Sequence, residues 1–269
     1  MESRLIASTM TYKTCTLERA LTKLRENGFT KVELCSAGTF VPHFDMQNAT
    51  DEDIEKIAEF AEKTGIRIAA INVNSAGNID QNNYFVGDGF KTVNTAFKLA
   101  AKLNCKIVTY LCGNITPGQD RKKRLAAITE FNRIAADIAD FYGITYAIEA
   151  PHKLTIAEKA DEIAEYWAMQ DKRVKCTFDV AHFTYSGQDA AEAAKRYAGR
   201  TAQVHLRDAV PGNSLLRYGE GKVDFAAIIK IFNDAGYKGC FSMEYPCDSE
   251  EESDERIKES IDFFKRFNI

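Results

Sequence analysis

The sequence predicts a single (β/α)8 TIM barrel spanning residues 1–269, and three observations lead to this prediction. Short runs rich in Val, Ile and aromatic residues alternate with amphipathic segments at helical spacing. Eight such runs can be counted, and strict alternation of strand and helix favours a closed parallel barrel with its helices outside. Four runs in the second half carry a polar residue near their C-terminal end, where barrel enzymes place their catalytic groups. An open doubly wound sheet is the alternative, but no Gly-rich phosphate-binding motif follows the first run.

The expected elements follow one another along the whole chain. The strand candidates are residues 4–10, 31–36, 67–74, 106–112, 145–150, 174–180, 201–208 and 239–245. The clearest helices are residues 51–64, 90–103, 121–141, 156–169 and 225–234. Several helical segments end in a glycine stop signal, at Gly28, Gly65, Gly143 and Gly236. The acidic run at residues 248–255 is expected to favour the start of a last helix through the helix dipole.

Composition excludes several classes of protein. A net charge of −4 disfavours nucleic acid as a partner, because binding to a phosphate backbone depends on Lys and Arg. No stretch approaches the roughly 20 apolar residues of a membrane span, and the amino terminus lacks the apolar core of a signal peptide. The seven cysteines form an odd number without a C-x-x-C pair, which is typical of reduced thiols. We therefore expect a cytoplasmic protein that acts on a small molecule, and a homo-oligomer is compatible with this.

The polar residues in the last four barrel strands predict a metal site. They are Glu149, Asp179, His205 and Glu244. A carboxylate or imidazole in an apolar strand is costly to bury unless it is paired, hydrogen-bonded or bound to a cation. One divalent cation explains all four residues together. Oxygen ligands with a single imidazole suit Mn²⁺, our first choice, and also Mg²⁺, Co²⁺ or Zn²⁺.

The alternation of side chains along a strand supports this site independently. Successive side chains point to opposite faces, so apolar neighbours such as Ile148, Phe178 and Val204 should face the helices. The four expected ligands then face the barrel interior. The same rule places further polar side chains inside, namely Glu33, Asn72, Asn74, Gln203 and Arg207.

Several motifs resemble the xylose isomerase-like TIM barrel superfamily of sugar isomerases and epimerases. The resemblance rests on Glu149, on Asp179-Val-Ala-His182, on His205-Leu-Arg-Asp208 followed by Gly219-Glu-Gly-Lys-Val-Asp-Phe225, and on Glu244 before Tyr-Pro. It implies one divalent metal ion held by Glu149, Asp179, His205 and Glu244. It also implies that a ketose or related polyol binds the metal, and that Glu149 and Glu244 transfer the proton.

The chemistry is consistent with these residue types. A proton next to a carbonyl becomes removable when a cation stabilises the enediolate, and two carboxylates can then take and return it. Arg207 is expected to contact a substrate oxygen, His182 to hydrogen-bond the enediolate, and Glu33 to contact or support the substrate. Each has a structural alternative: Arg207 as a counter-ion of Asp179 or Glu244, His182 as a helix cap, and Glu33 as a brace of the barrel.

Departures from the family limit the prediction of the substrate. The similar ketohexose 3-epimerases carry a glutamate and an arginine where this chain has Thr155 and Pro211. The first hypothesis is an isomerase or epimerase of a small, non-phosphorylated sugar or sugar-like ketone. The second is a dehydratase of inosose type on the same scaffold. The third, a nuclease of AP endonuclease type, needs more histidines than the four in this chain.

Two loops, at residues 37–50 and 75–89, are long enough to form walls or lids of the site. His43, in the first of them, is expected to be a packing residue rather than a ligand.

Overall fold

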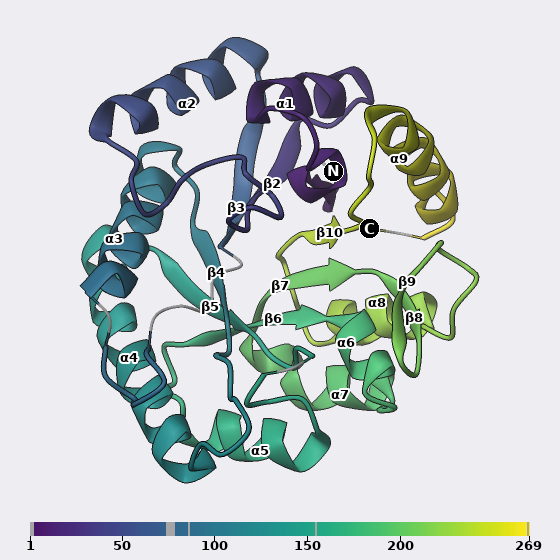
Figure 1. Ribbon diagram of the computed structural model, residues 1–269. Coiled ribbons are helices and arrows are strands. Elements are labelled where there is room, and N and C mark those ends of the chain that lie inside the picture. The colour runs from purple at the N-terminus through teal and green to yellow at the C-terminus, as the bar shows by residue number, and fades with distance from the viewer. Residues whose placement is uncertain (1–2, 74–78, 86, 154, 268) are drawn as a thin grey trace.

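Eight parallel strands close into a barrel, with helices around its outside (Figure 1). The computed structural model describes residues 3–73, 79–85, 87–153, 155–267 and 269. The strands follow one another around the barrel in the order β1-β10-β7-β6-β5-β4-β3-β2, which confirms the predicted TIM barrel. They are β1 (Leu5–Ser8), β2 (Lys31–Ser36), β3 (Arg67–Val73), β4 (Ile107–Leu111), β5 (Thr145–Glu149), β6 (Lys175–Asp179), β7 (Thr201–Leu206) and β10 (Phe241–Met243).

Several helices begin or end at recognisable capping residues. Thr50 and Asp53 form a capping box at the start of α2, and Gly65 ends this helix with a φ of 67°. The α-helices are α1 (Leu17–Glu26), α2 (Asp51–Thr64), α3 (Gly87–Lys102), α4 (Arg121–Tyr142), α5 (Ala160–Met169), α6 (Val180–Tyr185), α7 (Ala190–Tyr197), α8 (Phe225–Asp234) and α9 (Glu250–Phe264). The 3-10 helices are η1 (Thr9–Tyr12) and η2 (Ala198–Arg200).

Several strand ends differ from the sequence prediction by one or two residues, and two of these differences have a clear local cause. The first expected strand ran to residue 10, but it ends at Ser8, whose hydroxyl accepts a hydrogen bond from the Met10 amide and starts η1. The seventh expected strand ran to residue 208, but β7 ends at Leu206. A short antiparallel hairpin follows it, formed by β8 (Asp208–Val210) and β9 (Asn213–Leu216). The last helix begins as expected after Ser249, within the acidic run.

The inner and outer faces of the strands differ in chemistry, as the alternation predicts. Ile148, Phe178 and Val204 belong to the large apolar core. Polar pairs fill the interior; for example, the hydroxyl oxygens of Thr109 and Thr177 lie 2.7 Å apart. The polar interior therefore extends along the strands to their C-terminal ends, where the candidate site lies.

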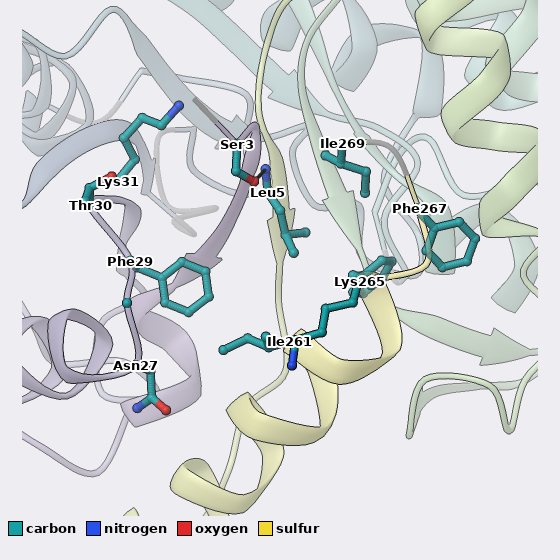
Figure 2. A pocket seen from close by; sticks show the side chains of 12 residues that line it. Ser3, Leu5, Asn27, Phe29, Thr30, Lys31, Ile261, Lys265, Phe267 and Ile269 are labelled. Carbon is teal, nitrogen blue, oxygen red and sulfur yellow. Dashed lines mark hydrogen bonds between the residues drawn. The ribbon is translucent and has the colours of Figure 1, made fainter. Parts of the chain in front are cut away.

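A separate hollow lies at the opposite, N-terminal end of the barrel (Figure 2). It is lined by the start of β1 at Leu5, the start of β2 at Lys31 and the end of α9 around Lys265. None of the expected site residues lies there.

The structure also bears on the expectations about membrane spans, disulfides and the long loops. Among the described residues, none of the helices has the length and apolar character needed to cross a lipid bilayer. The cysteines, all in the described part of the chain, form no disulfide with one another. Asn74 and part of the loop at residues 75–89 lie outside the described residues.

Candidate metal centre

Four neighbouring strands bring the expected ligands together at the C-terminal end of the barrel. Glu149 and Asp179 are the last residues of β5 and β6, His205 lies in β7, and Glu244 directly follows β10. The strand register places Asp179 beside His205. One potential ligand atom from each of the four side chains lies within 4.8 Å of the others, and all four residues are buried. The structure thus brings together the residues that the sequence singled out.

Glu33 lies behind His205. One carboxylate oxygen of Glu33 accepts hydrogen bonds from Nε2 of His205 at 3.1 Å and from Nε2 of Gln203 at 2.8 Å. The opposite ring nitrogen of His205, Nδ1, lies 3.0 Å from Glu149 and 3.5 Å from Glu244. A histidine whose far nitrogen is held by a carboxylate is the usual arrangement of a metal ligand. The hydrogen bonds of Glu33 support a role in positioning His205, and its contact with a substrate stays a prediction.

Arg207 lies between two of the expected ligands. Its Nη2 donates to Oδ2 of Asp179 at 3.3 Å and also to Oε2 of Glu244. Asn72 donates to the other oxygen of Glu244 at 3.1 Å. In the structure Arg207 is the counter-ion of Asp179 and Glu244, as its structural alternative expected, and its contact with a substrate oxygen stays a prediction. It is 9% exposed.

The pKa values reflect a cluster of buried carboxylates. Burial raises the pKa of Glu149 and Glu244 above the ordinary carboxyl value, although the positive charge of His205 opposes this. Burial also acts to raise the pKa of Asp179, but the nearby His182 and Arg207 lower it to about 2. For His205, burial acts to lower the pKa, and the charges of Glu244 and Glu33 raise it well above its ordinary value.

These donors fit a divalent cation. Glu149, Asp179 and Glu244, together with Glu33, surround one imidazole and one guanidinium, which supply the compensating positive charge. The second oxygen of Glu33 has no hydrogen-bond partner among the described residues. A cation that binds three carboxylates and a neutral imidazole would supply the charge that the protonated His205 otherwise provides. Such oxygen-rich donors do not select one metal.

His182 lies next to this centre on α6. The Asp179 side chain caps this helix by accepting hydrogen bonds from the amides of Ala181 at 2.7 Å and His182 at 3.2 Å. The His182 ring is 1% exposed, and neither of its nitrogens has a hydrogen-bond partner among the described residues. Its Nε2 lies 3.6 Å from Oδ2 of Asp179. His182 therefore lies where the sequence prediction needs it, and its contact with an enediolate stays a prediction.

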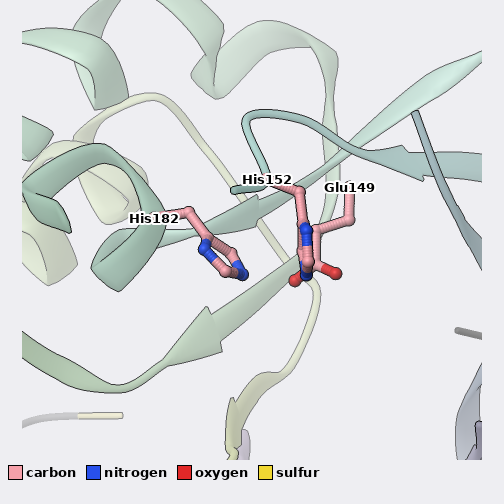
Figure 3. Close-up of side chains that lie close together, drawn as sticks. All are labelled: Glu149, His152 and His182. Carbon is pink, nitrogen blue, oxygen red and sulfur yellow. The ribbon is translucent and has the colours of Figure 1, made fainter. Parts of the chain in front are cut away.

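A second histidine, His152, was missed by the sequence analysis. Its ring centroid lies 4.2 Å from that of His182, and Figure 3 shows both rings next to the carboxylate of Glu149. A sequence signal existed: Glu149-Ala-Pro-His152 and Asp179-Val-Ala-His182 share an acidic residue followed three positions later by histidine. Because β5 and β6 are neighbours, the repeated spacing places both histidines on the same side of the centre.

Asp208 has a structural role that the motif did not reveal. Its carboxylate accepts hydrogen bonds from the amides of Gly219 at 2.7 Å, Gly221 at 2.9 Å and Ala209 at 2.8 Å. A Cβ atom built on Gly221 would lie 2.0 Å from Oδ1 of Asp208, so a side chain has no room there. The His-Leu-Arg-Asp and Gly-Glu-Gly motifs thus fold one loop onto the end of β7.

Two further positions also have structural partners. The His43 ring lies 3.0 Å from the Thr9 hydroxyl and 3.2 Å from the Tyr12 carbonyl, as expected of a packing residue. Thr155 occupies a position where this chain differs from the ketohexose 3-epimerases that it resembles. Its hydroxyl donates to the carbonyl of His152 at 2.6 Å and accepts from Cys112. Pro211 lies at the turn between β8 and β9.

Comparisons with known proteins agree with the fold. A family model described as xylose isomerase-like TIM barrel matches residues 21–267. An inosose dehydratase of Clostridium perfringens is 30% identical over 112 residues, which cover 35% of this chain and only 38% of that protein. A putative hydroxypyruvate isomerase of Streptomyces coelicolor is 24% identical, and the match covers 81% of each chain. The crystal structure of a D-allulose 3-epimerase from Methylomonas sp. superimposes with a TM-score of 0.78 at 15% identity, covering 97% of this chain and 96% of that one.

Proposed function

Because the chain belongs to the xylose isomerase-like TIM barrel family, we propose that it is a divalent-metal-dependent isomerase or epimerase. Its substrate would be a small, non-phosphorylated sugar or a sugar-like ketone. The observation that carries the proposal is the convergence of Glu149, Asp179, His205 and Glu244 at the mouth of the barrel. Mn²⁺ is the first candidate for the metal, with Mg²⁺, Co²⁺ and Zn²⁺ as alternatives.

The arrangement of the two glutamates supports proton transfer. A bound divalent cation would act as a Lewis acid that stabilises negative charge on the substrate's oxygens. Glu149 and Glu244 reach the centre from β5 and β10, on either side of His205. One carboxylate removes the proton from the carbon next to the carbonyl, and the other returns a proton to a neighbouring or opposite position.

The other polar groups would orient the substrate. Neither ring nitrogen of His182 has a hydrogen-bond partner within the described part of the chain, so the ring can donate a hydrogen bond to an enediolate oxygen. Arg207 is placed to contact a substrate oxygen if a cation replaces its bonds to Asp179 and Glu244. Glu33 would keep Nδ1 of His205 directed at the centre through its bond to Nε2.

A dehydratase is the second candidate, and the similarity to inosose dehydratases favours it. On the same scaffold the enediolate would expel a β-hydroxyl instead of being reprotonated. The two reactions differ in their products, since only the dehydratase loses water. A nuclease has less support, because the net charge of −4 gives no attraction to a phosphate backbone.

The test is turnover of a ketose panel in deuterated water with added Mn²⁺, read by chromatography and mass spectrometry. We expect products that are isomers of the substrate and that carry solvent deuterium at the carbon next to the carbonyl. Glu149→Gln and Glu244→Gln should each lower turnover by roughly 10² to 10⁴-fold, whereas Glu59→Gln on the exposed face of α2 should have no effect. Full conversion without solvent deuterium would overturn the proton-transfer scheme, and loss of water would identify the dehydratase.

Metal binding is tested separately with the Asp179→Ala, His205→Ala double variant. This variant should lose the ion of the centre, because half of its proposed protein ligands are absent. Retention of near-stoichiometric metal at this centre would contradict the assignment.

A further inference from the structure

A cluster of Glu149, His152 and His182 lies directly beside the candidate metal centre. One potential ligand atom from each residue lies within 4.8 Å of the others. The cluster shares Glu149 with the centre, and its other two members, His152 and His182, are not among the four expected ligands. Figure 3 shows the two imidazole rings and the carboxylate directed toward one another.

The two histidines have nitrogens available for a ligand. Nδ1 of His152 lies 2.9 Å from the carbonyl oxygen of Lys153, so Nδ1 carries the proton and Nε2 presents a lone pair. This is the tautomer that metal-binding histidines adopt, with the far nitrogen donating to a backbone carbonyl. His182 is 1% exposed, and both of its nitrogens lack a hydrogen-bond partner among the described residues. A buried imidazole without partners is costly, and a ligand in the cluster would remove that cost.

Glu149 can serve both sites. Oε1 of Glu149 interacts with Nδ1 of His205, and a carboxylate has a second oxygen that can bind another cation. Carboxylates that bridge two cations about 3.5–4 Å apart are typical of two-metal enzymes.

We propose that Glu149, His152 and His182 form a second cation site that binds a Zn²⁺-type ion next to the first centre. Two imidazoles and one glutamate are the protein ligands of several catalytic zinc sites, in which water or substrate occupies the open position. Bonds of about 2.0–2.2 Å require the donor atoms to lie closer together than the 4.8 Å limit, so a small movement of the partly exposed His152 completes the site. The imidazoles favour Zn²⁺ or Co²⁺ over Mg²⁺, in contrast to the oxygen-rich first centre.

The second site extends the proposed function without depending on it. It shares only Glu149 with the first centre, so the two sites can fail separately. An ion there would present its open position to a substrate oxygen, and His182 would then act on the substrate through this ion; the direct hydrogen bond of the proposed function applies when only the first centre holds an ion.

The test is titration of the metal-free protein with Co²⁺, followed by visible absorption and by elemental analysis after dialysis. The variants are His152→Ala and His182→Gln for the second site, and Glu244→Gln for the first. Glu244 is preferred to Asp179 because Asp179 caps the helix that carries His182. Lys153→Ala is the matched control, since it changes the exposed neighbour of His152 but keeps the backbone carbonyl that accepts from its ring.

We expect two Co²⁺ ions per chain for the wild type and for Lys153→Ala. His152→Ala and His182→Gln should each lower the affinity for one of the two ions by at least about 100-fold. Loss of an outer hydrogen-bond partner alone already lowers metal affinity about 10- to 100-fold, and these variants lose a ligand itself. Glu244→Gln should weaken only the other ion. Binding of a single ion that is lost in Glu244→Gln and retained in His152→Ala would overturn the second site and leave the proposed function standing. Binding of a single ion that is lost in His152→Ala and retained in Glu244→Gln would support the second site and contradict the first centre.

Discussion

Replacing Glu33 with glutamine tests whether this residue positions His205 or contacts the substrate. The carboxylate accepts hydrogen bonds from His205 at 3.1 Å and from Gln203 at 2.8 Å. Glutamine keeps the shape, but its amide has one acceptor oxygen and no charge. The variant therefore loses the charge-assisted bond that fixes the ring of His205.

The magnitude follows from that lost bond. A hydrogen bond to a charged group contributes about 1.5–3 kcal/mol, and loss of the outer partner of a metal-binding histidine weakens metal binding about 10- to 100-fold. This range corresponds to about 1.4–2.8 kcal/mol in the binding free energy. One effect acts in the opposite direction: without the charge of Glu33 the pKa of His205 falls, so protons compete less with the metal. Measurement at mildly alkaline pH reduces this second effect.

The assay is calorimetric titration of the metal-free Glu33→Gln variant with Mn²⁺, with Glu59→Gln as the control. We expect weaker Mn²⁺ binding in Glu33→Gln and an unchanged KM for the sugar once Mn²⁺ is saturating. Unchanged Mn²⁺ binding with a raised KM would refute the positioning role and would restore Glu33 as a substrate contact.

Three further predictions concern the charges of the centre and the loop that Asp208 and Gly221 hold beside it. The pKa values of Glu149 and His205 are raised, and the metal binds the deprotonated forms of both residues. Metal affinity should therefore rise with pH, and metal binding should release protons. Calorimetry in buffers of different ionisation enthalpy measures the number of protons released. Arg207→Met should strengthen Mn²⁺ binding, since it removes a competing cation, and should raise KM; weaker Mn²⁺ binding would contradict this. Gly221→Ala should lower the free energy of unfolding by about 1–3 kcal/mol in urea titrations, because its Cβ would meet Asp208; unchanged stability would contradict the close packing.

Much of the fold follows from local patterns in the sequence. Helix stops such as Gly65 were predicted from the sequence, and the capping box of Thr50 and Asp53 that starts the same helix is also a local signal. Where a local signal was overlooked, the prediction was wrong. The first strand ends at Ser8 because its side chain starts a 3-10 helix, which an apolar run does not reveal.

The convergence of the four expected ligands could also be predicted from the sequence. Side chains alternate along each strand, and the C-terminal ends of parallel strands meet at one end of a barrel. Glu149, Asp179, His205 and Glu244 each lie at or near such an end, so closure of the barrel alone is sufficient to bring them together.

The partners of these ligands were decided only by the tertiary structure. Glu33 reaches His205 across 172 residues, and Arg207 lies between Asp179 and Glu244, whereas alternation along a strand specifies only the face. Which groups pair depends on strand register around the closed barrel, on side-chain rotamers and on the balance of buried charge. His152 lies in the loop after β5; the repeated acidic-x-x-His spacing singles it out in the sequence, but only the folded loop shows that its ring meets that of His182.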